Sequence, residues 1–118
     1  MGILEKLRPA PRWKHADPAV RASAVFELGA DAGDVLRTLV REDGDARVRR
    51  TAVSRLVDID VLRETAKSDP DDEVRQEAVR CLAGLAAESE SPDEALRSVQ
   101  ALVELGRLKE LAAVARDG

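Results

Sequence analysis

The chain is short of the residues that usually carry chemistry. Its 118 residues include one Cys, one His, one Trp, one Phe and no Tyr. The lone thiol, Cys81, excludes an intrachain disulfide and a multi-thiolate metal site, and it suits a reducing compartment. No apolar run approaches the ~20 residues of a membrane span, and the N-terminus has no apolar stretch of signal-peptide length. We therefore expect a cytoplasmic protein that does not cross a membrane.

Motifs for catalysis or metal binding are also missing. His15 is the only imidazole, so a Ser-His-Asp arrangement or a His-based metal site has little to build on. The glycines are scattered singly, which excludes a Gly-rich phosphate loop. The acidic segment 69–73 does not match a calcium loop, because Val74 stands where that loop needs Gly and Arg80 where it needs Glu. The sequence thus predicts no catalytic residue, no metal and no cofactor.

The charge balance is acidic, with a net charge of −4 and a pI near 5.1. This argues against a general binder of nucleic acid or anionic membranes, because such proteins need a positive field. The exceptions are the basic first 15 residues and one cluster of arginines, Arg47, Arg49, Arg50 and Arg55. The basic stripe does not continue at the equivalent positions of the other repeats described next, so nucleic-acid binding stays an alternative.

Three segments of the chain repeat one pattern. Residues 17–28, 45–56 and 71–82 share D-x-x-V-R-x-x-A-V-x-x-L, and they follow one another at intervals of 28 and 26 residues. A fixed period of this size indicates a stacked-repeat architecture. The apolar positions recur at i, i+4, i+5 and i+8, so each segment is predicted to be an amphipathic helix. The leading Asp is suited to cap the helix, and Pro18 occupies the favoured first helical position.

A second helix is expected to complete each unit. Shorter apolar-periodic segments at 35–42 and 61–68 fill this role, and a decayed fourth copy of the pattern extends to the end of the chain. We expect an all-α superhelix of about four short helical pairs, with repeats near 17–42, 45–68, 71–88 and 93–117. The short helix expected near 83–90 is predicted to be merged or distorted.

The pattern D-P-x-x-V-R-x-x-A-x-x-x-L resembles the HEAT-like repeats of bacterial proteins, including those grouped with phycobilin lyases. The likeness covers residues 16–117, and it implies a right-handed α-solenoid whose D-x-x-V-R helices line the concave face. The opening segment 4–13 is also similar to the start of the N-terminal arrays of longer bacterial proteins. Arg116, Asp117 and Gly118 correspond to a repeat junction, so we expect a longer solenoid, or a last face that meets a partner or a second copy through Leu108, Leu111 and Val114.

The arginine of the repeat pattern, Arg21, Arg49 or Arg75, recurs at one helix position. We interpret each as pairing with an aspartate or a loop carbonyl of an adjacent repeat through planar contacts. The alternative is that all three bind a ligand. The predicted structural ladder consists of these arginines and the repeat aspartates: Arg21, Arg49, Arg75, Asp17, Asp45 and Asp71.

Residues 1–15 are predicted to form a short helix and a basic Pro/Trp strap. Phe26 is a large apolar side chain at a position held by Ser54 and Arg80 in the later repeats, and it needs cover. Trp13 is the expected lid over Phe26. The alternative is an exposed aromatic hot spot for a partner.

The leading hypothesis is a non-enzymatic module that binds a protein or peptide on its concave face. The candidate surface consists of positions of the three D-x-x-V-R helices that lie off the apolar stripe: Ser23, Phe26, Arg47, Arg50, Thr51, Ser54, Gln76, Glu77 and Arg80. The alternatives are an accessory subunit or domain of a lyase-type enzyme and a nucleic-acid-binding protein. A spacer or oligomerisation element is a third class.

Overall fold

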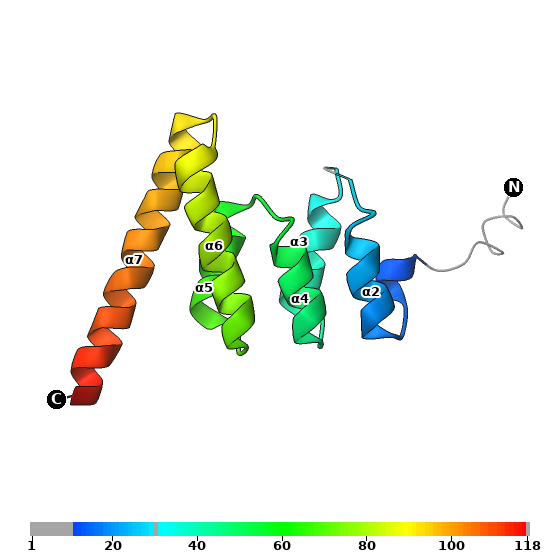
Figure 1. Ribbon diagram of the computed structural model, residues 1–118, viewed down its shortest axis with the longest axis horizontal. Coiled ribbons are helices and arrows are strands. Elements are labelled where there is room, and N and C mark those ends of the chain that lie inside the picture. The colour runs from blue at the N-terminus through cyan, green and yellow to red at the C-terminus, as the bar shows by residue number, and fades with distance from the viewer. Residues whose placement is uncertain (1–10, 30, 118) are drawn as a thin grey trace, which may run out of the picture.

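The computed structural model describes residues 11–29 and 31–117, with side chains described up to residue 107. Their order is η1 (Arg12–Lys14), α2 (Pro18–Val25), α3 (Gly33–Glu42), α4 (Ala46–Val53), α5 (Ile59–Ser68), α6 (Asp72–Glu88) and α7 (Pro92–Asp117) (Figure 1). The described part of the chain contains no strand. The protein is an all-α helical repeat solenoid. Of the N-terminal region expected at 1–15, residues 1–10 lie outside the described residues.

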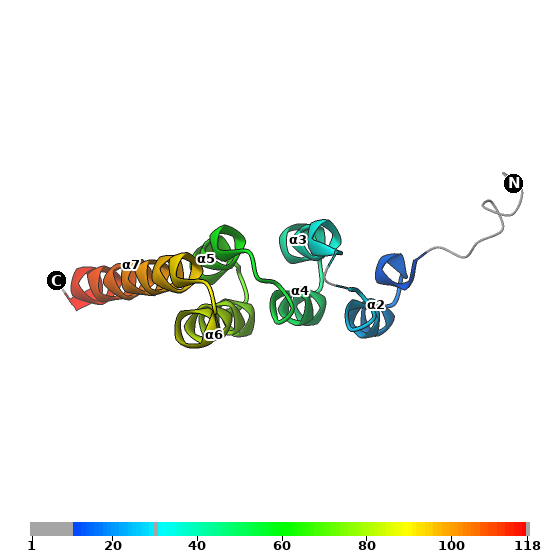
Figure 2. The same cartoon turned by 90° about the horizontal axis from the view of Figure 1, so that it is seen from above.

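The helices stack in two layers. Helices α2, α4 and α6 form one layer, while η1, α3 and α5 form the other, and α7 closes the stack (Figure 2). The molecule extends over 63 × 34 × 19 Å, with a radius of gyration of 16.9 Å. A globular chain of this length has a radius near 13.5 Å, about 3 Å less. The fold is therefore a row of local contacts and not a sphere.

Aspartates begin four of the helices. Asp17, Asp45 and Asp71 accept hydrogen bonds from backbone N–H groups of the first turn of α2, α4 and α6, at 2.9 Å, 2.8 Å and 3.1 Å. Asp58 does the same for α5, accepting from Val61 at 3.2 Å. These carboxylates satisfy N–H groups that no helical carbonyl can reach.

The core is built from the repeated apolar positions. Val48, Val74, Ala52 and Ala78 are fully buried, and Ala24 is almost so. The alanine of the repeat pattern, Ala24, Ala52 or Ala78, lets neighbouring helices approach closely, because only a methyl group must fit between them. The core therefore runs along the whole stack between the two layers.

The structure groups the helices differently from the expected repeats. Helix α3 packs on α4, and α5 packs on α6, whereas α2 with α3 and α4 with α5 meet only weakly. The reason is loop length: three residues, 43–45 or 69–71, join each packed pair. A connection this short makes successive helices antiparallel neighbours. The unit therefore runs from α3 to α4, and not from α2 to α3.

The last two expected repeats, near 71–88 and 93–117, form one hairpin of long helices. Helix α6 has 17 residues and α7 has 26, against eight or ten in the helices before them. No proline interrupts the chain after Pro92, and Gly106 alone does not stop a helix. The C-terminal part thus departs from the regular stack.

The buried stripe predicts a clear difference between two valines. Val48 is fully buried and Val57, in the α4–α5 loop, is 60% exposed. Val48→Ala should lower the free energy of unfolding by about 2 kcal/mol, because it removes two buried carbon atoms and leaves a cavity. Val57→Ala is the matched control and should change it by less than about 0.5 kcal/mol. Urea unfolding followed by circular dichroism measures both, and equal effects would contradict the assigned core.

Candidate interaction surface

The residues predicted to bind a partner all lie on or directly after the helices of the α2, α4 and α6 layer. Seven of them are exposed: Ser23, Phe26, Arg47, Arg50, Ser54, Gln76 and Arg80. The other two, Thr51 and Glu77, are half-buried. The layer therefore presents one continuous outer surface, which we call the α2/α4/α6 face.

Phe26 is the most exposed large apolar residue among those that the structure describes, at 62%. The expected lid is wrong: Trp13 packs against the hydrophobic core, and Phe26 remains uncovered. Phe26 directly follows the buried pair Ala24 and Val25, and the helical step of about 100° per residue turns its side chain out of the core. What lies over the Phe26 ring is the Arg55 guanidinium, 5.6 Å from the ring centroid.

Ion pairs cover the α6 end of this face. Arg50 of α4 pairs with Glu73 of α6 at 3.0 Å, and Arg80 pairs with Glu77 at 2.6 Å. Arg47 and Arg55 form no ion pair within the described side chains. The face therefore has one arginine, Arg55, beside Phe26 and paired charges on α6.

Two repeat arginines lie inside the stack and away from this face. Arg21 contacts both carboxylate oxygens of Asp43, at 2.9 Å and 3.1 Å. Arg49 contacts both oxygens of Asp69, at 3.0 Å and 3.3 Å. Both aspartates are 6% exposed, and the hydrogen bond to Asp43 raises the pKa of Arg21 above its ordinary value. These bidentate pairs tie the α3–α4 turn to α2 and the α5–α6 turn to α4.

The turns at 43–45 and 69–71 are also hydrogen-bonded to the helix that follows each of them. The Asp43 carboxylate accepts from the N–H of Asp45 at 2.9 Å, and the Asp43 carbonyl accepts from Arg49 at 3.0 Å. Asp69 repeats the arrangement one unit later, with its carbonyl accepting from Arg75 at 2.6 Å. The contacts thus form a continuous ladder of arginines and turn aspartates.

The ladder has irregular ends. At the start, His15 replaces the turn aspartate: its Nδ1 accepts from the Asp17 N–H at 3.0 Å, and its carbonyl accepts from Arg21 at 2.9 Å. At the far end, the only carboxylate among the described side chains that Arg75 contacts is that of the exposed Asp72 in its own helix, and no turn carboxylate takes its place. The regular stack therefore stops at α6.

The turn aspartates were not among the residues predicted to form the ladder. The repeat pattern had grouped the caps Asp17, Asp45 and Asp71 with the arginines, but the ladder carboxylates are Asp43 and Asp69, each two residues before a cap. The signal was the repeated spacing Asp-x-Asp at 43–45 and 69–71.

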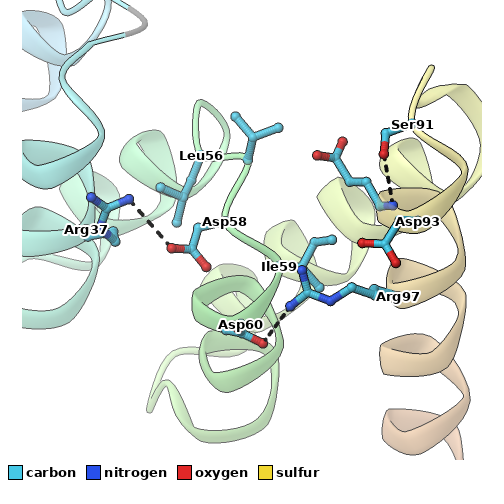
Figure 3. Close-up of a pocket in the computed structure, with 10 residues that line it drawn as sticks. Arg37, Leu56, Asp58, Ile59, Asp60, Ser91, Asp93 and Arg97 are labelled. Carbon is cyan, nitrogen blue, oxygen red and sulfur yellow. Dashed lines mark hydrogen bonds and ion pairs between the residues drawn. The ribbon is translucent and has the colours of Figure 1, made fainter.

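An open groove of about 450 Å³ lies between α3, the start of α5 and the start of α7 (Figure 3). Both of its arginines pair with aspartates of the groove: Arg37 lies 3.6 Å from Asp58, and Arg97 lies 3.2 Å from Asp60. These pairs connect α3 to α5 and α5 to α7. The ion pairs of the groove therefore hold helices together, and its arginines already have acidic partners.

Cys81 is unsuited to act as a nucleophile. Burial and then the adjacent Glu77 carboxylate raise the pKa of its thiol to about 11. Its Sγ lies 3.4 Å from the carbonyl oxygen of Val53. A catalytic thiol needs the opposite, a positive neighbour that lowers the pKa.

No group of three or more His, Cys, Asp or Glu side chains that could hold a metal occurs among the described residues. None of the described helices is long and apolar enough to span a bilayer. A protein-family model described as HEAT repeats matches residues 10–83, which end within α6. No curated protein and no solved structure matches the chain.

The ladder predicts a large loss of stability at one arginine and a small loss at its neighbour. Arg49→Ala should lower the free energy of unfolding by about 2–4 kcal/mol, because it leaves the nearly buried Asp69 without its partner. Arg50→Ala is the control. Arg50 lies in the same helix as Arg49, but its ion pair with Glu73 is exposed, so its removal should lower the free energy of unfolding by less than about 1 kcal/mol. Urea unfolding at neutral pH measures both, and an unchanged midpoint for Arg49→Ala would assign that arginine to a ligand.

The raised pKa of Cys81 predicts slow alkylation in the native protein. Iodoacetamide reacts with the thiolate, and at pH 8 a thiol of pKa about 11 is almost wholly protonated. In the urea-unfolded chain the pKa returns to about 8.5, so alkylation at pH 8 should be more than about tenfold faster there. The native rate should keep rising with pH up to about 11. Mass spectrometry follows the reaction, and equal native and unfolded rates would contradict the assignment.

Proposed function

The chain belongs to the HEAT repeat family, and we propose that it is a non-enzymatic module that binds a partner protein through the α2/α4/α6 face. The observation that carries this proposal is Phe26. An aromatic ring that is 62% exposed is costly to leave in water, and exposed aromatics mark the centres of protein interfaces.

The charges around Phe26 indicate the chemistry of the partner. Arg55 lies over the ring and forms no ion pair among the described side chains. A partner segment that places an apolar side chain beside carboxylates would complement this area. Glu73 and Glu77 interrupt the basic surface on α6, which favours a protein over the phosphate backbone of a nucleic acid.

Two further observations support the non-enzymatic assignment and the proposed cytoplasmic location. The only thiol has a raised pKa of about 11, and the only imidazole, His15, accepts a backbone hydrogen bond in the turn before α2. Both groups thus have structural roles. A reduced, half-buried cysteine is also what a cytoplasmic protein would carry.

Capture from a source lysate tests the proposal. Immobilised protein should retain a partner, and Phe26→Ser should reduce its recovery more than about tenfold, as expected for a central aromatic anchor. Val57→Ser is the matched control, because Val57 is equally exposed but lines the groove between α3 and α7. Nuclease treatment of the lysate should leave the recovery unchanged.

Arg55→Glu tests the charge of the partner. It should weaken binding, and the wild-type complex should dissociate more readily as salt is raised. Equal recovery by wild type and Phe26→Ser, or a selective loss in Val57→Ser, would refute the α2/α4/α6 face as the binding surface. Loss of the partner after nuclease treatment would favour the alternative function, nucleic-acid binding.

A further inference from the structure

The outer face of α7 carries an apolar stripe that the fold does not cover. Leu96, Val99 and Val103 are 56%, 44% and 46% exposed, while Ala101 on the opposite side of the helix is buried. With Gly106 they follow the spacing of four and three residues that defines a coiled-coil seam. This stripe is independent of the face proposed to bind a partner protein.

The stripe lies where the regular stack stops. Val25 and Val53 are fully buried by the helix that follows in their layer, but the equivalent Val79 of α6 is 39% exposed. No helix after α7 covers this end in the described part of the chain (Figure 1). The sequence analysis expected self-association here, through Leu108, Leu111 and Val114, whose side chains lie outside those described.

We infer that α7 pairs with α7 of a second copy in an antiparallel, two-fold symmetric seam. In an antiparallel pair centred near Ala101, two seam residues face each other when their residue numbers add up to 202. Val99 then faces Val103 of the second copy, and Leu96 faces Gly106. The largest seam residue meets the smallest, which lets the two helices approach evenly along the seam.

The flanking charges favour the same register. Asp93, Gln100 and Arg107 are spaced by seven residues, so they form one row beside the seam. In the register given above, Asp93 faces Arg107 of the second copy, and Gln100 faces its own symmetry mate. The Asp93–Arg107 contact therefore occurs twice and the Gln100 contact once, at the two-fold axis, as an isologous interface requires. A shift of one heptad would break both the size match and the charge match.

The face is open to such a partner. Val99, Gln100, Val103, Glu104 and Arg107 line a shallow depression of about 410 Å³ along α7. At 1.5 Å per residue, the 26 residues of α7 span about 39 Å, which is long enough for the seam and its flanking rows. The inner side of the helix stays packed on α5 and α6.

The experiment is sedimentation equilibrium of the 118-residue chain over a range of concentrations. The wild type should form a dimer. Asp93→Arg and Arg107→Asp each set like charges against each other twice, so each should weaken the dimer at least about tenfold. The double variant Asp93→Arg/Arg107→Asp restores opposite charges and should dimerise about as well as the wild type.

A seam variant and a control complete the test. Val103→Glu should give a monomer with unchanged helix content, and Val57→Glu, an equally polar change outside the apolar stripe of α7, should still dimerise. A wild-type chain that stays monomeric at millimolar concentration would overturn the inference. A dimer that ignores the single charge reversals, or that the double reversal fails to restore, would overturn the antiparallel register.

Discussion

The structure depends on one contact, repeated along the stack: an arginine of one repeat held by the aspartate of the next short turn. Asp43 and Asp69 each receive a bidentate arginine, a backbone N–H and, through their carbonyls, the arginine of the following repeat. A nearly buried carboxylate is tolerable only with all these donors in place. The contact therefore sets the length of the turn, the antiparallel packing of α3 on α4 and of α5 on α6, and the spacing between repeats.

Where this contact ends, the regularity of the fold ends too. Arg75 has no turn aspartate ahead of it and contacts its own helix. Beyond that point α6 and α7 have 17 and 26 residues, against eight or ten in the earlier helices, and Val79 is exposed although its repeat equivalents are buried. The match to HEAT repeats also ends within α6. A regular stack and a divergent terminal hairpin thus present different surfaces, and it is physically reasonable for them to have different partners.

The surface proposed for partner binding follows from the two-layer arrangement. Because each helix buries one stripe between the layers, the remaining positions of α2, α4 and α6 face outwards in register, and their chemistry is unconstrained by packing. Most of them carry polar or paired groups. Phe26 is the exception, and its neighbour Arg55 lies in the turn that follows α4, so the stacking of repeats brings together a ring and a cation that are 29 positions apart.

The sequence by itself determined the helices, their aspartate caps and the buried apolar stripe, because these depend on local spacing and on groups within a few residues of one another. It also placed the nine candidate surface residues outside the core. Only the tertiary structure decided that α3 pairs with α4, that Asp43 and Asp69 hold the arginines, and that Phe26 is left bare while Trp13 joins the core. These outcomes depend on which helices meet across the layers, and a repeat pattern specifies the helical period without specifying which neighbour each helix packs against.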